Sequence, residues 1–213
     1  MLDYNKFMSM QGYTSCDKLK AINNIISNRK NVNTVVEVGS YCGRSSSCIA
    51  ETIGENIDLY CIDHFLEERW ASGKYADGKD GRPLAGTCLN QRAEFEKNTK
   101  SYKNIKMVTG YFPYDIKWSG GDIDIFFLDS DHQNPDDTDI LTHICKFMPA
   151  GSLIIGDDAK IDYAHGHNVF YNISILEKAY DTKAKFDFKN GNYTDDLWTI
   201  EVTKDYINLK DYI

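Results

Sequence analysis

Acidic side chains follow two apolar runs of the sequence at a spacing that suggests chemistry. The stretch IDIFFLDSDHQNP carries Asp129 and Asp131 just after its apolar part, and SLIIGDD ends in Asp157 and Asp158. Carboxylates that crowd together cannot all stay ionised without a counter-charge. Either their pKa values rise, or a hard divalent cation such as Mg²⁺ binds their oxygens. The alternatives are a metal-free acidic pocket that attracts a cationic ligand, and a capping role for the DD pair.

A bound cation would bring an acceptor hydroxyl close to a donor group and lower its pKa, which favours the oxyanion as nucleophile. His132 stands beside these acids, and an imidazole with an ordinary pKa of about 6.5 suits proton abstraction at neutral pH. A structural hydrogen bond is the alternative role for His132. The acidic pattern is also typical of the Mn²⁺ site of nucleotide-sugar glycosyltransferases.

A glycine-rich turn, EVGSYCGRSS, lies between an apolar run and a helical pattern. Gly39 permits a tight turn and the close approach of a ligand to the backbone, and Gly43 permits close packing where the helix begins. The helix N-terminus offers free N–H groups to an anion such as a carboxylate. The turn is neither the GxGxxG fingerprint nor a phosphate-binding loop. An ordinary tight turn is the alternative.

Asp63 ends the next apolar run, about twenty residues after the glycine turn, where an acid can accept hydrogen bonds from a ribose diol. The alternative for Asp63 is a turn or helix cap. Together the turn and the acid indicate a nucleoside pocket without a pyrophosphate clamp.

Apolar runs alternate with helical patterns, which predicts an α/β fold: a doubly wound, mostly parallel sheet of about seven strands with helices on both faces. Five strands are expected in the parallel part, at 34–39, 57–63, 105–110, 122–129 and 152–158. Helices are expected between and around them, at 18–29, 44–54, 88–102, 138–148 and 170–180. Two closing strands, 183–188 and 196–202, are expected to pair antiparallel at one edge. Ligands bind such sheets at the carboxyl ends of the strands, where the acids and glycines fall.

Length and composition limit the protein's class. The 213 residues, of which 42% are hydrophobic, predict one globular domain over 1–213 without a membrane-spanning helix. Six cysteines without a CxxC pair indicate reduced thiols and a cytoplasmic setting. A net charge of −8 argues against nucleic acid as a partner and leaves a small-molecule acceptor. The segment 65–87 matches no strand or helix, so we expect a surface loop or a lid over the site.

Five motifs together resemble class I S-adenosylmethionine-dependent methyltransferases. VVEVGSYCGRSS is similar to their motif I and CIDHF to their acidic second motif. With GYFPYDI, FFLDSDH and PAGSLIIGDD, they resemble the metal-dependent small-molecule O-methyltransferases of the macrocin type, over roughly residues 30 to 160.

The resemblance implies a role for each matching residue. It implies that Glu37, Gly39 and Ser45 line the methionine end of S-adenosylmethionine beside Gly43, and that Asp63 holds the ribose. Gly110 and Tyr111 would lie near the adenine. The residues that match the metal ligands are Asp129, Asp157 and Asp158. Asp131 matches the general base, with His132 as the alternative.

Three other functions stay open from the sequence. A glycosyltransferase would use the acidic pattern but would not need the glycine turn. A non-catalytic domain could keep the fold and the cofactor. A nucleic-acid methyltransferase is disfavoured by the acidic charge and by the lack of a basic stripe.

Overall fold

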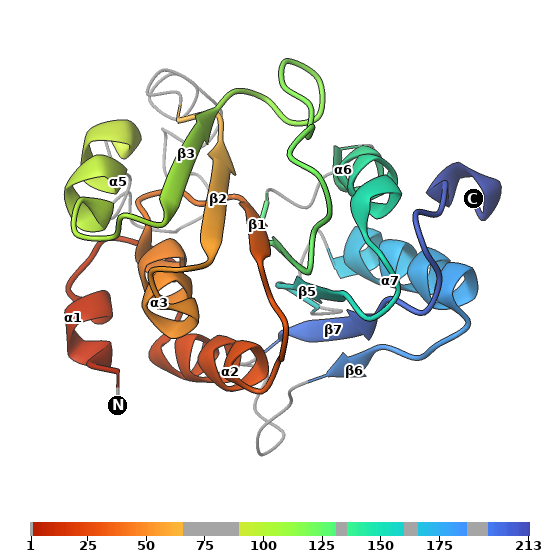
Figure 1. Cartoon of the computed structure of the whole chain (residues 1–213), viewed down its shortest axis with the longest axis horizontal. Helices are drawn as coiled ribbons and strands as arrows, with labels where there is room; N and C mark the ends of the chain where they lie inside the picture. Colours follow the sequence, from red (N-terminus) through yellow and green to blue (C-terminus); the bar gives the residue numbers. More distant parts are fainter. Residues whose placement is uncertain (1, 66–89, 131–135, 160–165, 187–195) are drawn as a thin grey trace.

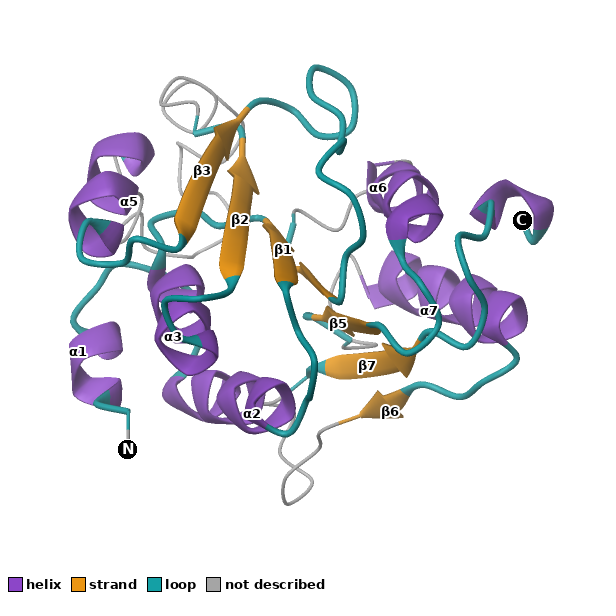
Figure 2. Ribbon diagram, viewed as in Figure 1, coloured by secondary structure: helices purple, strands orange, loops and turns teal. Residues whose placement is uncertain are grey.

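The computed structural model describes residues 2–65, 90–130, 136–159, 166–186 and 196–213. A seven-stranded sheet forms the centre of the molecule, and helices lie on both sides of it (Figure 1, Figure 2). The strands are β1 Thr34–Val38, β2 Asp58–Asp63, β3 Ile105–Thr109, β4 Ile125–Leu128, β5 Leu153–Gly156, β6 Lys185–Phe186 and β7 Trp198–Glu201. The helices are α1 Tyr4–Met8, α2 Cys16–Ser27, α3 Arg44–Ile53, α5 Gln91–Thr99, α6 Asp136–Ile144 and α7 Gly166–Tyr180, with the 3₁₀ turns Cys145–Phe147 and Leu209–Asp211.

The strand order is β3-β2-β1-β4-β5-β7-β6. Strands β1 to β5 are parallel, and β7 runs antiparallel between β5 and β6. The chain moves outward from β1 to β3 and then returns to β4 on the other side of β1. The order therefore reverses between β1 and β4, and the carboxyl ends of these two strands form the switch point where ligands bind in such sheets. The doubly wound sheet and its antiparallel edge confirm the fold predicted from the sequence.

Alternation along the strands divides the core between the two faces of the sheet. Val35 and Phe127 pack with apolar residues of α2, α3 and α5, whereas Val36 and Phe126 pack with those of α6 and α7. Successive strand residues point to opposite faces, so a strand that is buried on both sides must be apolar throughout. This explains why the central strands β4 and β5 are apolar throughout, whereas β3 at the edge of the sheet carries the exposed Lys106.

Helix boundaries follow from the capping residues. Helix α2 begins after Ser15, whose side chain accepts a hydrogen bond from the Lys18 N–H at 3.1 Å. Gly54 ends α3 with a φ of 78°, as the sequence predicts for a C-cap. The short helix α1 was not expected. Its five residues are too few to give a periodic pattern, and it is held by the burial of Phe7 against Leu19 and Cys48.

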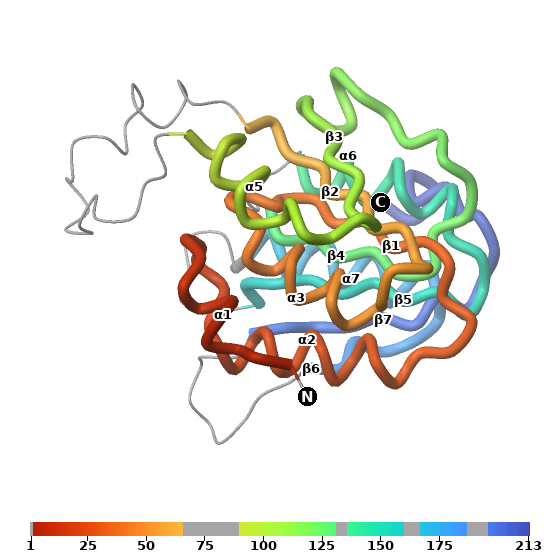
Figure 3. The backbone as a smooth tube through the Cα atoms, turned by 60° about the vertical axis from the view of Figure 1, so that its left-hand side comes forward, coloured from red at the N-terminus to blue at the C-terminus, as the bar shows by residue number. Residues whose placement is uncertain are grey.

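Helix α2, near the N-terminus, contacts the C-terminal part of the chain. Figure 3 shows it running beside the C-terminal strand β7. Two ion pairs connect them: Lys18 Nζ lies 2.7 Å from Asp196 Oδ1, and Arg29 Nη1 lies 2.9 Å from Glu201 Oε1. Within the described part of the chain, no helix is long and apolar enough to cross a membrane.

Candidate active site

The switch point is closed by a contact between the ends of β1 and β4. Gly39 has a φ of 97°, and its N–H donates to the Ile62 carbonyl at 3.0 Å. A Cβ atom at this position would lie 1.8 Å from the carbonyl oxygen of Asp129. The sequence predicts that Gly39 permits close backbone approach; in the structure the approaching group is the backbone of the neighbouring strand.

Glu37 organises the glycine turn from inside the protein. Its carboxylate is fully buried and accepts hydrogen bonds from Ser40 Oγ at 2.8 Å, from Ser45 Oγ at 2.7 Å and from the Ser46 hydroxyl. Burial raises the pKa of Glu37, and the serine hydroxyls oppose this because they stabilise the ionised form. Glu37 and Ser45 thus shape the turn. Ser40 and Ser46 were not identified from the sequence as partners of Glu37, although the high serine content of the turn could have indicated them.

Gly43 gives α3 its close contact with α5. It has a φ of 85°, and a Cβ here would lie 2.9 Å from Thr99 Cγ2 and 3.0 Å from Phe95 Cδ2. This is the close packing expected at the start of the helix. The N-terminus of α3 is therefore packed directly against α5.

The N-terminal segment lies against the glycine turn. Arg44, the first residue of α3, donates from Nε to the Met10 carbonyl at 3.0 Å and from Nη1 to the Thr14 carbonyl at 2.9 Å. The exposed Tyr13 ring packs on Tyr41, with ring centroids 5.2 Å apart. Tyr41 is a turn residue with a φ of 47°, so this aromatic pair sits beside the switch point.

Asp63 is held at the end of β2 by two backbone groups. Its Oδ2 accepts from the Tyr41 N–H at 2.8 Å, and its Oδ1 accepts from the Phe65 N–H at 3.0 Å. The capping role is therefore present. A carboxylate offers about four acceptor positions, so these two bonds leave capacity for a ligand hydroxyl.

Tyr111 follows β3 beside Asp63. The Gly110 N–H donates to the Asp63 carbonyl at 3.0 Å, and the Tyr111 hydroxyl donates to Asp136 at the start of α6. The Tyr111 ring stacks on Tyr114 at 5.4 Å and lies 6.4 Å from the His64 ring. His64 and Tyr114 extend this aromatic group beyond the site residues expected from the sequence, although Tyr114 belongs to the GYFPYDI motif.

A lysine lies within the acidic cluster at the end of β5. Lys18 Nζ is 2.5 Å from Asp157 Oδ1, 2.7 Å from Asp196 Oδ1 and 3.4 Å from Asp158 Oδ1. Lys18, Asp157 and Asp196 are buried, with 8%, 3% and 0% of their surfaces exposed, whereas the Asp158 side chain is 39% exposed. The crowded carboxylates expected from the sequence thus receive their counter-charge from within the chain.

Charge and burial act in opposite directions in this cluster. Burial by itself lowers the pKa of Lys18, but the charges and hydrogen bonds of Asp157 and its neighbours outweigh it and raise that pKa. Lys18 is therefore an ammonium ion at neutral pH. Burial also raises the pKa of Asp157, against the opposing effect of the Lys18 charge.

Three carboxylates of this cluster are close enough together to be considered as ligands of the expected metal ion. One carboxylate oxygen from each of Asp157, Asp158 and Asp196 lies within 4.8 Å of the others, and hard oxygens suit Mg²⁺. Among the described residues Asp196 completes this group and Asp129 is not part of it. With the Lys18 ammonium against all three carboxylates, the residues as arranged do not fit a divalent cation.

The two expected bases, Asp131 and His132, lie outside the described residues, as do residues 66–87 of the expected lid. The residue before the gap, Ser130, donates its hydroxyl to Asp137 of α6. Asp196 and Lys18 were not identified from the sequence as members of this cluster. Asp196 follows a polar stretch, and Lys18 resembles any other lysine of an amphipathic helix.

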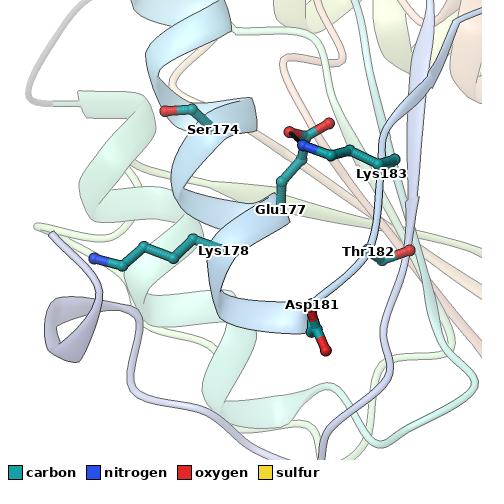
Figure 4. Close-up of a pocket in the computed structure, with 6 residues that line it drawn as sticks. All are labelled: Ser174, Glu177, Lys178, Asp181, Thr182 and Lys183. Carbon is teal, nitrogen blue, oxygen red and sulfur yellow. Dashed lines mark hydrogen bonds and ion pairs between the residues drawn. The ribbon is translucent and has the colours of Figure 1, made fainter.

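A shallow surface hollow of about 500 Å³ lies away from this site. Figure 4 shows its lining at the C-terminal end of α7, where Lys183 Nζ and Glu177 Oε2 are 2.8 Å apart. The hollow precedes β6, which runs parallel to β5 because β7 is antiparallel to both. It therefore lies at the amino-terminal edge of the sheet, opposite the strand ends that carry the candidate site.

Solved structures share the fold at low sequence identity. The O-methyltransferase TomG from Streptomyces achromogenes, involved in tomaymycin synthesis and in complex with SAM, is 14% identical with a TM-score of 0.63, over 90% of this chain and 82% of that chain. The O-methyltransferase from Bacillus cereus in complex with SAH is 16% identical with a TM-score of 0.61, over 90% and 83%. The O-methyltransferase NovP is 16% identical with a TM-score of 0.64, over 91% and 84%.

No curated protein sequence matches the chain. A family model does: residues 36–159, more than half of the chain, match the family described as a methyltransferase domain. The matched region runs from β1 through the glycine turn, Asp63 and Tyr111 to the residues after Asp157 and Asp158. The chain therefore belongs to this methyltransferase family, and its fold is that of the class I S-adenosylmethionine-dependent methyltransferases.

Proposed function

We propose that this protein transfers a methyl group from S-adenosylmethionine to a hydroxyl oxygen of a small molecule. One observation carries the proposal: the region that matches the methyltransferase family contains the whole switch point, with the glycine turn, Asp63 and the β5 acids at adjoining strand ends. Two structural relatives, which are O-methyltransferases in complex with SAM or SAH, support the same cofactor and acceptor atom.

The cofactor would lie across the ends of β1 and β2. Its methionine end would meet the turn between Gly39 and Gly43, which Glu37 and Ser45 hold in shape. Asp63 would accept hydrogen bonds from the ribose hydroxyls with the acceptor positions that its two N–H partners leave. The adenine would lie near Gly110 and the ring of Tyr111.

The reaction is an in-line displacement. The acceptor oxygen forms a bond to the methyl carbon, the carbon–sulfur bond breaks, and its electron pair stays on sulfur to give neutral S-adenosylhomocysteine. The hydroxyl proton passes to a base, for which Asp131 is the candidate and His132 the alternative. Such a transfer depends mainly on holding the two reactants in line.

A divalent cation is not needed for this proposal. Three carboxylates with hard oxygens support metal assistance, but Lys18 already contacts all three. We therefore propose transfer without a metal ion to a sugar, catechol-like compound or similar natural product. A transfer assay with added Mg²⁺ and with chelator separates the two forms of the proposal.

The cellular setting proposed is the cytoplasm. The cysteines in the described ranges are free thiols, and Cys42, Cys48, Cys61 and Cys145 are buried. Reduced thiols are usual in a reducing compartment.

A ligand screen tests the function. We expect S-adenosylmethionine and S-adenosylhomocysteine to raise the melting temperature, because a ligand that binds only the folded state stabilises it. Transfer of a radiolabelled methyl group to small hydroxylated compounds then tests the reaction. If nucleotide-sugars raise the melting temperature and the two methionine derivatives do not, the protein is a glycosyltransferase and the proposal is wrong.

A further inference from the structure

The acidic cluster combines residues from three distant parts of the chain. Asp157 and Asp158 follow β5, Asp196 precedes β7, and Lys18 comes from the first turn of α2. The Asp158 N–H also donates to Asp157 Oδ1 at 2.7 Å, and Trp198 Nε1 donates to the Asp157 carbonyl at 3.3 Å. The backbone around Asp157 is therefore fixed, and the position of its carboxylate is set by the fold.

The position of Lys18 is fixed as well. Ser15 caps α2 and places Lys18 in its first turn, while Leu19, Ile22 and Ile26 anchor the helix against the core. The other lysine of this helix, Lys20, is exposed and pairs with Asp17 at the surface. The packing of its own helix thus places Lys18 in the interior, where only 10% of its side chain is exposed.

We propose that Lys18 is the resident cation of the Asp157–Asp158–Asp196 cluster, standing where a divalent metal ion would otherwise bind and closing the cluster to metals. The inference uses the site assigned under the proposed function but concerns its cation chemistry, which can be measured without any turnover. At this cluster of described residues, the charge that a divalent metal ion would supply then comes from Lys18.

Coordination geometry supports this assignment. A divalent cation such as Mg²⁺ needs carboxylate oxygens in direct contact at about 2.0–2.1 Å in a near-octahedral arrangement. The oxygens of Asp157 and Asp196 that would supply them already lie 2.5 Å and 2.7 Å from Lys18 Nζ. A metal ion on the same oxygens would lie directly beside the Lys18 ammonium, and the two positive charges would repel each other.

The hydrogen-bonding capacity of Lys18 defines its role. An ammonium group has three N–H donors, and three carboxylates surround Lys18 within 3.4 Å. Two of its donors go to Asp157 Oδ1 and Asp158 Oδ1, and the charge of Asp196 lies 2.7 Å away, so Lys18 acts as a positioning residue that holds the carboxylates together. Asp158, the most exposed of the three carboxylates and the one farthest from Lys18, is the member left to face a ligand.

Manganese binding tests the proposal, with electron paramagnetic resonance to count free Mn²⁺. The wild-type protein should take up no stoichiometric Mn²⁺ at this cluster. Lys18→Met removes the charge, keeps an unbranched side chain and should bind one Mn²⁺ at least about 100-fold more tightly, since three carboxylates form a hard-oxygen site. Lys20→Met, which removes an exposed lysine from the same helix, should behave as wild type.

Two results would overturn the proposal. One is wild-type binding of one Mn²⁺ that Asp158→Asn weakens, and the other is a folded Lys18→Met protein that gains no affinity. If Lys18→Met does not fold alone, refolding it with Mn²⁺ still decides: recovery of the native circular dichroism supports the proposal, and wild-type binding overturns it regardless of the variant. Calorimetry with S-adenosylhomocysteine, run in parallel, shows separately whether the proposed cofactor binds.

Discussion

The ammonium nitrogen of Lys18 lies 2.5 Å from a carboxylate oxygen of Asp157, although 139 positions separate the two residues in the chain. This contact joins the first turn of α2 to the end of β5. The site at the strand ends is therefore built partly from a helix that precedes the whole matched methyltransferase region. The first turn of α2 therefore supplies the positive charge of this cluster.

Removing the Lys18 charge should destabilise the protein strongly. Lys18→Met leaves buried carboxylates without their partner, and breaking a buried pair in this way costs about 3–5 kcal/mol. Chemical denaturation monitored by circular dichroism measures the loss. Lys20→Met should change the free energy of unfolding by less than about 0.5 kcal/mol. Equal effects of the two changes would contradict the structure.

Stability should depend on pH through Glu37. Burial raises its pKa in the folded state, so the folded state holds the proton more tightly than the unfolded one. The contribution of Glu37 to the free energy of unfolding is therefore fully present at pH values below its pKa in the unfolded state. It is lost as the pH rises through its pKa in the folded state. Glu37→Gln cannot titrate. The stability of the variant relative to wild type should improve as pH increases over that range, and a constant difference in denaturation experiments would refute this.

Asp63→Ala should weaken the binding of S-adenosylhomocysteine. Hydrogen bonds to a charged group contribute about 1.5–3 kcal/mol, which corresponds to a loss of roughly 10- to 100-fold in affinity. Calorimetric titration measures it. Asp58→Ala is the matched control, because Asp58 lies at the opposite end of the same strand with a half-exposed side chain 3.6 Å from Lys106. Unchanged affinity in Asp63→Ala would remove its proposed ribose role.

Gly39→Ala should force the ends of β1 and β4 apart, because the added Cβ would lie 1.8 Å from the Asp129 carbonyl oxygen. Gly151→Ala separates this clash from backbone strain. Gly151 has a φ of 96°, against 97° for Gly39, and its Cβ would meet nothing within 4 Å. Strain alone costs about 1–2 kcal/mol, so Gly151→Ala should remain folded while Gly39→Ala loses several times more. Similar melting temperatures for the two variants would show that the clash is relieved.

Arg44→Ala should release the N-terminal segment from the glycine turn. The variant loses the hydrogen bonds to the Met10 and Thr14 carbonyls that hold this segment. Chymotrypsin should then cut at the exposed Tyr13 faster than in wild type, because cleavage needs local opening of the backbone. Arg92→Ala, which removes an exposed arginine paired only with Glu96 in the described contacts, is the control. Equal cleavage rates in all three proteins would show that Arg44 does not hold the segment.

Local patterns were sufficient for much of the fold. Each of the five parallel strands ends in a glycine or an acid or is followed directly by one. Parallel strands bring such ends to one edge of the sheet, so the expected residues near β1, β2 and β5 could be grouped from the sequence alone. Gly43 and Gly54 also act as the sequence predicts, because a positive φ and close helix packing are local requirements. Helix α1 was not predicted because its five residues are too few to show a repeating apolar pattern.

The sequence by itself determined the sheet, the glycine turn and the methyltransferase resemblance, since periodicity and motif order are properties of neighbouring residues. Only the tertiary structure decided which charges meet. The residues next to Lys18 and Asp196 in the chain do not indicate that the two form an ion pair. The pair depends on how α2 packs beside β7, which the local sequence of either element does not specify. The same packing places the Lys18 ammonium against Asp157, Asp158 and Asp196, a counter-charge for buried carboxylates that the sequence did not indicate.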